Sequence, residues 1–279
     1  MSAPSIVTDM DEQTYHARTE LSSTGVRRIL DSPARFRWEQ THRVESVAFD
    51  VGHAVHAQIL GAGSDVTPIP DEHLTPSGAV STKAATVAWL TEQRAAGLVP
   101  IGPADAYRID AMTDAVLAHR GARRILEQPD AQSEVSAFAT DPETGVQCRA
   151  RFDLLASTAA DLKTTAGEAS AIGFGRDAAK HGYPIQEAHY LDVLEWATGE
   201  RRPFVFVVVE KAAPHLVAVH ELDEVTRLVA RDLAARARRT YAECLATGVW
   251  PGYGDDTITP YIPAWWINQA DDDTEDMVI

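Results

Sequence analysis

Cysteine is scarce in this sequence of 279 residues, and its scarcity removes several classes of site. The two cysteines, Cys148 and Cys244, lie far apart in the chain. An iron–sulfur cluster or a structural zinc site needs several clustered ligands, so two isolated cysteines cannot hold one alone. We expect both thiols to be reduced and buried.

Long apolar runs and a basic N-terminal segment are also missing. No stretch of about 18 apolar residues occurs, so no membrane span and no membrane partner are expected. The opening residues, MSAPSIVTDMDEQTYH, lack the basic segment and apolar stretch of a secretory signal. A cytoplasmic location is therefore the expectation.

Positive charge is in deficit, since the formal net charge is -16. Such a charge argues against a protein that coats nucleic acid without specificity, because that mode depends on many lysines and arginines. It does not exclude a protein that holds nucleic acid in a channel, where the local charge decides. Part of the acidic excess is the tail ADDDTEDMVI, which we predict to be a solvated and mobile end.

Apolar periodicity predicts a mostly helical N-terminal part followed by an α/β core, in which a mixed β-sheet is flanked by helices. We expect helices at 20–40 (ending near Asp31–Pro33), 46–63, 81–96, 103–119 and 121–127. The core is predicted to have a hairpin at 133–156, strands at 159–165, 203–211 and 215–222, and helices at 168–182, 184–199 and 223–248.

These elements predict one domain over residues 1–250, with a helical part at about 15–128 and a catalytic core at about 130–250. Residues 251–279 form a separate C-terminal segment with the acidic tail. The sequence does not give the role of Trp265 and Trp266 in this segment, which could dock on the domain or on a neighbouring subunit.

The stretch AADLKTT (159–165) places two opposite charges two residues apart in a predicted strand. Asp161 and Lys163 therefore face the same way, while Leu162 faces the other side. Asp153 lies on the preceding strand and Glu134 on the strand before it, so the carboxylates can converge. Neighbouring carboxylates repel unless a cation lies between them, and oxygen ligands suit Mg²⁺ or Mn²⁺. Such a cation activates water, and the lysine can orient that water.

A D-x-K triplet alone is more often a solvated strand face or an ion pair. Several further segments, however, resemble RecE-type (exonuclease VIII) phage exonucleases of the PD-(D/E)xK nuclease superfamily, relatives of lambda exonuclease and of the RecB nuclease domain. Phe152 departs from this pattern, because proline often precedes the motif aspartate. The segments with this resemblance occur in the family's order over about residues 15–250: YHARTELSSTGVRRILDSPARFRW, FDVGHAVHAQIL, DPETGVQCRARFDLL, ADLKTT, YPIQEAHYLDVL and PFVFVVVEK.

The resemblance implies a metal-dependent 5′→3′ double-strand DNA exonuclease that releases 5′-nucleotides in phage or prophage recombination. It implies Mg²⁺ or Mn²⁺, one or two per active site, and a ring-shaped homo-oligomer (a trimer or tetramer) that threads DNA ends. A single-strand annealing protein is an expected partner. The implied metal ligands are His56, Glu134, Asp153, Asp161 and the carbonyl of Leu162, and the implied catalytic set adds Lys163, Gln186 and Tyr190.

DNA contacts are expected from residues near the first helix and on the hairpin. Arginine forms bidentate contacts with phosphate, and a helix N-terminus can receive a terminal phosphate. Arg149 and Arg151 share the parity of Asp153, so regular alternation would place them on the catalytic side. The candidates are Ser22, Thr24, Arg27, Arg28, Arg149 and Arg151.

The candidate residues could instead have purely structural roles, and the fold could serve other functions. His56 could be a core histidine, Tyr190 core packing, Gln186 a helix-capping partner, and each arginine an ordinary ion-pair member. Among functions, the rivals are a RecB/Cas4-like single-strand nuclease, an endonuclease, and a catalytically inactive DNA-binding module of the same fold.

Overall fold

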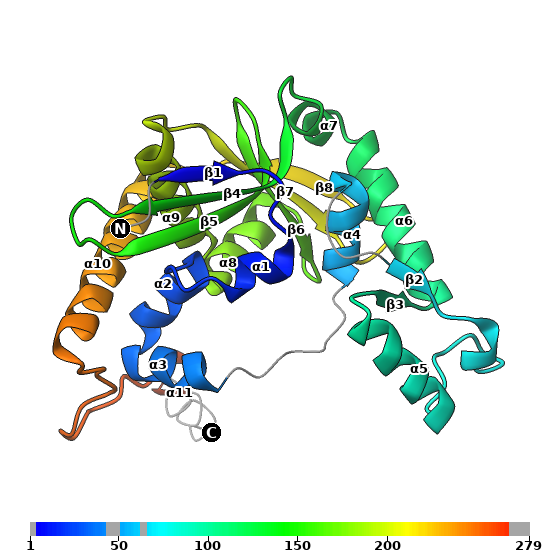
Figure 1. The fold of residues 1–279 in the computed structure, drawn as a ribbon, viewed down its shortest axis with the longest axis horizontal. Helices are drawn as coiled ribbons and strands as arrows, with labels where there is room; N and C mark the ends of the chain where they lie inside the picture. The colour runs from blue at the N-terminus through cyan, green and yellow to red at the C-terminus, as the bar shows by residue number, and fades with distance from the viewer. Residues whose placement is uncertain (1–3, 43–50, 62–65, 268–279) are drawn as a thin grey trace, which may run out of the picture.

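The computed structural model describes residues 4–42, 51–61 and 66–267. Its centre is a six-stranded sheet in the order β1-β4-β5-β6-β7-β8 (Figure 1). Strands β6 and β7 are parallel and the other neighbours are antiparallel, so the sheet is mixed as predicted. The strands are β1 (Ser5–Val7), β4 (Gln132–Thr140), β5 (Gln147–Leu155), β6 (Ala159–Thr165), β7 (Phe204–Glu210) and β8 (Val217–His220).

Helices cover both faces of this sheet. The larger core lies between one face and helices α2 (Ser23–Asp31), α8 (Ala171–His181), α9 (Tyr183–Thr198) and α10 (Glu224–Thr247). The opposite face packs on α4 (Val51–Leu60), α6 (Pro103–Ala118) and α7 (Arg120–Leu126).

Strand β7 shows why the chain builds this layered arrangement. Its residues FVFVVVE are apolar up to the last one, and the first six are buried. Phe206 packs into the core under α8 and α9, whereas Val207 packs on the other face. A continuous apolar run suits a central strand that is covered on both sides.

Within the segment 20–40, the first helix, α2, ends at Asp31 as predicted, and a second helix that was not expected follows Ser32. The Ser32 backbone is extended, and its hydroxyl accepts a hydrogen bond from the Arg35 amide at 3.3 Å. It thereby caps α3 (Pro33–Thr41), which starts with proline at a position where no amide donor is needed. Within the predicted helix at 46–63, α4 occupies Val51–Leu60, and residues 46–50 lie outside the described part.

Several short elements had no clear signal in the sequence. They are strand β1, helix α1 (Glu12–Ala17), a two-stranded parallel sheet of β2 (Val66–Pro68) and β3 (Val99–Ile101), and the short helix η1 (Asp71–His73). Strands of three residues carry too little periodicity to be read, and their pairing comes from tertiary contacts. Helix α5 (Ala84–Ala95) matches the expected helix at 81–96.

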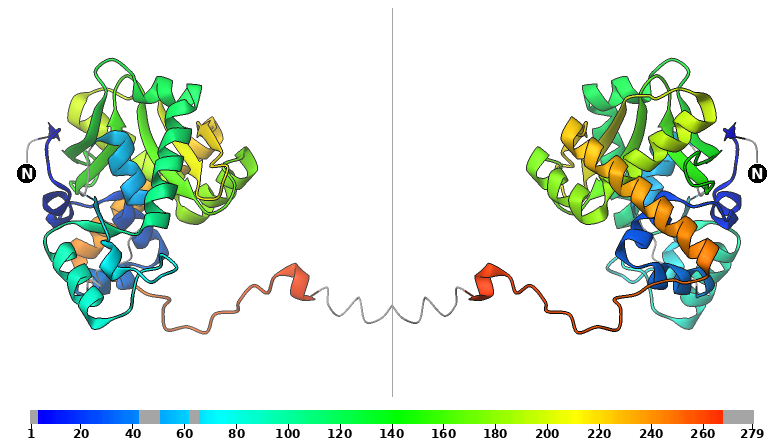
Figure 2. Two further views of the ribbon diagram at one scale, coloured as in Figure 1. Left: turned by 90° about the vertical axis from the view of Figure 1, so that its right-hand side faces the viewer. Right: turned by 90° about the vertical axis from the view of Figure 1, so that its left-hand side faces the viewer.

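The C-terminal segment is anchored at its start and then leaves the body of the protein (Figure 2). Trp250 stacks on Phe36 of α3, and the Tyr253 hydroxyl accepts a hydrogen bond from Arg35 at 3.0 Å. The short helix α11 (Ala264–Ile267) lies at the far end of this arm. The Trp265 side chain and the acidic tail lie outside the described residues. Among the described helices, none is long and apolar enough to cross a membrane.

Candidate active site

Three carboxylates are aligned across three neighbouring strands. Leu154 pairs with Ala160 in the antiparallel β5–β6 register, so Asp153 lies opposite Asp161 one position further along. Glu134 lies opposite Asp153 in the β4–β5 register, between the pairs Ser133–Leu154 and Val135–Phe152. The three carboxyl groups are close enough that the charges of Asp161 and Glu134 both act on Asp153. The structure therefore brings together the acidic residues that the sequence singled out.

Asp161 is the most deeply buried member of this row. Its side chain is 2% exposed, and Oδ1 accepts a hydrogen bond of 2.6 Å from Gln186 of α9. The other oxygen, Oδ2, forms an ion pair with the ammonium of Lys163 on the same strand. Asp161 and Lys163 are two residues apart and therefore project from the same side of the strand, as expected.

Asp153 is held between a backbone amide and a histidine. Its Oδ2 accepts a hydrogen bond of 2.7 Å from the Leu162 amide and lies 3.4 Å from His56 Nδ1. Burial raises the pKa of Asp153 well above its usual value, and the negative charges of Asp161 and Glu134 raise it further. Lys163 opposes these effects but does not cancel them.

Lys163 remains a cation in this setting. Burial by itself lowers the pKa of Lys163, but the attraction of Asp161 and Asp153 outweighs it and the net direction is upward. Its ammonium also lies 4.8 Å above the ring of Tyr183. The sequence alone did not indicate Tyr183 as a site residue, although its position three residues before Gln186 puts both on one face of α9.

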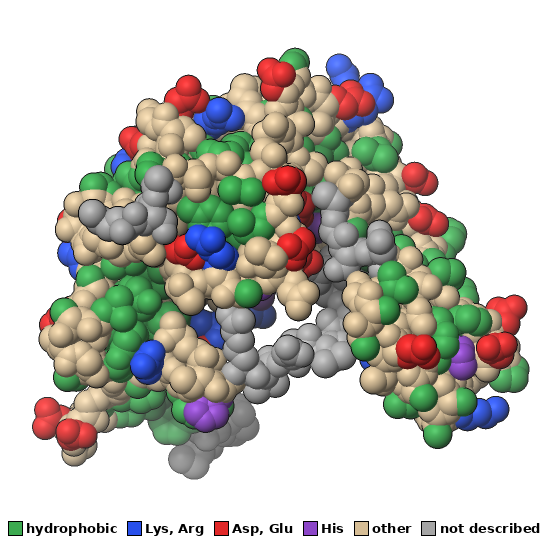
Figure 3. Space-filling view, in the orientation of Figure 1, with side chains coloured by type: hydrophobic (Ala, Val, Ile, Leu, Met, Phe, Trp, Pro, Cys, Tyr) green, Lys and Arg blue, Asp and Glu red, His purple; other side chains and the backbone are tan. Residues whose placement is uncertain are grey.

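Glu134 occupies an irregular position in β4. Its φ is +55°, a left-handed value that a residue with a Cβ adopts at a cost. The Arg151 Nε donates to Glu134 Oε2, and Arg151 Nη1 donates to the Met10 carbonyl at 2.9 Å. In this structure Glu134 is therefore engaged by an arginine on the next strand. Acidic and basic side chains lie side by side near the middle of the face that Figure 3 shows.

The strand alternation that places the hairpin arginines is regular, since Cys148, Ala150 and Phe152 all pack into one core. It breaks only after Phe152, because Leu155, three positions further on, packs into the same core. Arg149 is 6% exposed, lies 4.6 Å from the ring of Tyr15, and donates to the Tyr15 carbonyl. Arg149 therefore shares the side of Arg151, as alternation predicts, but Tyr15 covers it, so it lies in the interior and not on a DNA-facing surface. Arg151 does lie beside the site, through Glu134.

The remaining candidates lie around helices α2 and α9. Tyr190 packs on Phe152 at 5.2 Å, and its pKa is raised well above the usual value, first by burial and also by Asp161 and Asp153. Arg27 donates to the His181 carbonyl and to Thr24 Oγ1, and its pKa is lowered by burial. The negative charge of Asp161 is close enough to raise the pKa of Arg27, against the larger effect of burial.

Two further DNA-binding candidates have local roles. Ser22 caps α2 by accepting a hydrogen bond from the Gly25 amide at 3.2 Å. Arg28 forms an ion pair with Glu39 of α3. Ser22 and Arg28 already have these protein partners, so each would have to release its partner before it could bind a phosphate.

The chemistry of the carboxylate row fits a divalent cation. Two aspartates and an imidazole are hard or borderline donors. The pKa of Asp153 is raised first by burial and then by the charges of Asp161 and Glu134, and a cation would stabilise its ionised form. Their present positions are set by protein partners, since Asp161 is turned to Lys163 and Gln186. Within the described residues, no three His, Cys, Asp or Glu side chains converge as a complete metal site.

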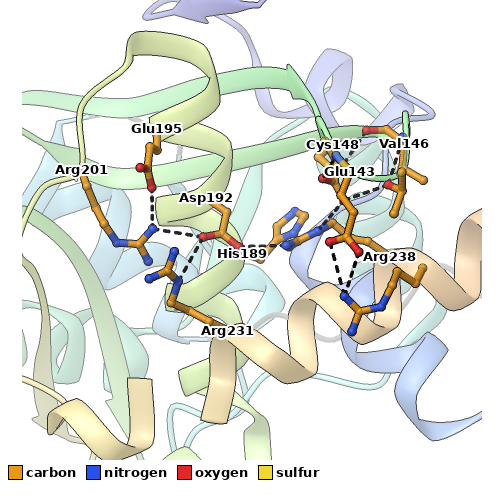
Figure 4. Close-up of polar contacts among 12 residues, drawn as sticks. Glu143, Val146, Cys148, His189, Asp192, Glu195, Arg201, Arg231 and Arg238 are labelled. Atoms are coloured by element: carbon orange, nitrogen blue, oxygen red, sulfur yellow. Dashed lines mark hydrogen bonds and ion pairs between the residues drawn. The ribbon is translucent and has the colours of Figure 1, made fainter. Parts of the chain in front are cut away.

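A second buried cluster of charges lies between α9, α10 and the β4–β5 turn (Figure 4). Arg238 donates from Nε to Asp141 and from Nη2 to Asp192, both at 3.0 Å, and its guanidinium lies 4.8 Å from the Trp196 ring. His189 is fully buried beside this cluster. Burial, followed by the Arg238 charge, lowers the pKa of His189 to about 3. This cluster joins elements distant in sequence and is structural.

Comparison with solved structures gives a similar fold. A protein from Eubacterium rectale, whose crystal structure is described as that of a "Putative exonuclease", has a TM-score of 0.59 with this chain at 13% sequence identity. The alignment covers 93% of this chain and 98% of that one. At this identity the likeness concerns the fold, and it confirms the predicted α/β class with a mixed sheet between helices. No curated protein sequence matches this chain.

The family comparison covers most of the chain and includes the whole carboxylate row. Residues 22–257 match the model described as "PDDEXK-like domain of unknown function (DUF3799)". The match spans His56, Glu134, Asp153, Asp161 and Lys163, and it confirms the predicted PD-(D/E)xK-like nature of the domain. The chain therefore belongs to the DUF3799 family of PDDEXK-like domains.

Proposed function

We propose that this protein is a metal-dependent nuclease that hydrolyses phosphodiester bonds in DNA. The observation that carries the proposal is the meeting of Asp153 and Asp161 on adjacent strands with Lys163 beside them. Gln186, from a different element, fixes the orientation of Asp161. Membership of a PDDEXK-like family and the name given to the Eubacterium rectale protein support the same class of activity.

Each residue of the site has a role in this proposal. Asp153, Asp161 and the Leu162 carbonyl would hold Mg²⁺ or Mn²⁺, with His56 as a further ligand and Glu134 serving a second ion. A bound divalent cation supplies Lewis-acid activation of water and of a phosphate oxygen. Lys163 would orient the attacking water and stabilise negative charge that develops on the phosphate.

The substrate proposal is a double-stranded DNA end, degraded from 5′ to 3′ as in RecE-type exonucleases. Arg27 and Arg151 flank the carboxylate row and could contact the backbone phosphates after exchanging their present partners. The ring-shaped homo-oligomer, the annealing-protein partner and the role in recombination rest on the sequence resemblance alone.

The test uses linear and covalently closed duplex DNA, with 5′-phosphate or 5′-hydroxyl ends, in Mg²⁺ or in EDTA. We expect Mg²⁺-dependent loss of linear DNA, with a label at the 5′ end released before one at the 3′ end. Cutting of closed circles would identify an endonuclease, and preference for single strands would favour the RecB/Cas4-like alternative. DNA binding without cleavage would support an inactive module and would refute the proposal.

Two matched lysine variants distinguish a specific role of Lys163 in cleavage from a general effect of removing one positive charge. Lys163→Met should lower the cleavage rate by about 100-fold or more, because it removes a cation from a buried site. Lys180→Met changes an exposed lysine on α8 and should leave the rate unchanged. Equal rates for Lys163→Met and the wild type would remove this lysine from the mechanism.

A further inference from the structure

The first turn of α9 contacts both members of the Asp161–Lys163 pair. Gln186 donates to Asp161 Oδ1 at 2.6 Å, and the ring of Tyr183 lies 4.8 Å from Lys163 Nζ. Residues three apart lie on one face of a helix, so one helical turn presents an amide to the carboxylate and an aromatic face to the ammonium.

The junction before this turn is fixed in place. Gly182 ends α8 and begins α9 with φ +68°, a value at which a side chain is strained. A Cβ at Gly182 would lie 2.7 Å from Cδ of Arg27, whose guanidinium donates to the neighbouring His181 carbonyl. The start of α9 is therefore held by α2 as well as by its own helix.

The Tyr183 ring is held by other rings. Its centroid lies 6.2 Å from that of Phe174, 5.9 Å from that of Phe206 and 5.6 Å from that of His181, with interplanar angles of 22–25°. Phe174 and Phe206 are buried core residues. The aromatic face toward Lys163 therefore belongs to a ring that packs on two core residues.

We propose that Tyr183 is a positioning residue, which holds the Lys163 ammonium over the site through its ring face. The role matters most when a divalent cation engages Asp161, because the ion pair that now orients Lys163 would then weaken. The ring attracts the ammonium without using a carboxylate, so it remains available in both situations. This inference rests on the proposed nuclease function.

The kinetic test compares Tyr183→Leu, Tyr183→Phe and the exposed-site control Tyr107→Leu. A cation–π contact of this kind corresponds to a rate effect of roughly 3- to 30-fold. We expect Tyr183→Leu to lower kcat by that factor with KM for DNA within twofold of the wild type. Tyr183→Phe keeps the ring and should keep the rate. Tyr107 is 77% exposed on α6, and its variant should behave as the wild type. Equal losses in Tyr183→Leu and Tyr183→Phe would overturn the role of the ring.

A second measurement does not depend on activity. The chain has four lysines, Lys83, Lys163, Lys180 and Lys211, so ¹³C-lysine labelling gives few ε-methylene signals, and Lys163→Arg assigns one of them. A ring face shifts nearby protons upfield. We expect this shift for Lys163 in the wild type and in Tyr183→Phe, without Mg²⁺ and with it, and its loss in Tyr183→Leu.

These two measurements fail in different ways. An unshifted Lys163 signal in the wild type would overturn the inference even if the protein cleaves DNA. An upfield signal that Tyr183→Leu abolishes, in a protein that cleaves no DNA, would leave the contact established while refuting the proposed nuclease and any catalytic use of the contact.

Discussion

The buried histidine of α9 makes a quantitative prediction about acid stability. His189 is fully buried, its Nε2 lies 3.1 Å from the Arg149 carbonyl oxygen, and its pKa is lowered from 6.5 to about 3. The unfolded chain binds a proton at this position below about pH 6.5, whereas the folded protein does not until about pH 3. This group's contribution to stability is therefore complete above pH 6.5 and is lost progressively as the pH falls to about 3.

The size of the effect follows from proton linkage. Between pH 7 and pH 5, the difference in protonation between the two states at His189 lowers the free energy of unfolding by about 2 kcal/mol. His189→Gln removes the titration. The wild type should therefore lose about 2 kcal/mol more than His189→Gln over this interval, whatever the absolute stability of the variant at pH 7.

Urea unfolding at pH 7 and pH 5, followed by tryptophan fluorescence, measures this double difference. Val193→Ala is the matched control, because Val193 is also fully buried on α9 and carries no titratable group. Its unfolding free energy should change with pH in parallel with the wild type. If His189→Gln also runs parallel to the wild type within about 0.5 kcal/mol, the assignment of a neutral, shifted histidine is wrong.

Further predictions concern the buried ion cluster, the core and the site. Arg238→Met leaves Asp141 and Asp192 without their shared cation and should lower the free energy of unfolding by about 3–5 kcal/mol in urea; an unchanged midpoint would contradict this. Phe206→Ala opens a cavity under β7 and should also cost about 3–5 kcal/mol, or roughly 5–9 °C in Tm by calorimetry; a shift below 2 °C would show that the core collapses to fill the space. Gln186→Leu removes the donor to Asp161 and should reduce cleavage by about 10-fold while the protein stays folded, as circular dichroism would show; full activity would make this contact dispensable. Treatment with EDTA should abolish cleavage and added Mg²⁺ should restore it, and cleavage that persists in EDTA would exclude a required divalent cation.

Strand β6 shows which features of this protein could be predicted from local sequence. The prediction of a strand at 159–165 matches the observed bounds, because a short apolar run followed by turn residues has few alternatives. Spacing also determined that Asp161 and Lys163 share a side, since alternation within a short, regular strand is a local property. The same reasoning correctly placed Arg149 on the side of Arg151, but it could not show that Tyr15 of α1 covers this arginine.

The partners of the site residues had to come from tertiary structure. Arg151 reaches Glu134 only through the hairpin register, and His56 reaches Asp153 from a helix almost a hundred residues earlier in the chain. Contacts of this kind depend on how elements pack, and periodicity carries no information about packing partners.

The amino-acid sequence by itself determined the order of the core elements, the central position of the apolar strand β7, and the acid–base pair on one side of β6. Those features follow from interactions between residues close in the chain. Tertiary structure alone decided that Tyr183 lies under Lys163, that Tyr15 covers Arg149, and that Arg238 joins two distant aspartates. Such arrangements are fixed when helices close over the sheet, because a buried charge is retained only where packing supplies its partner.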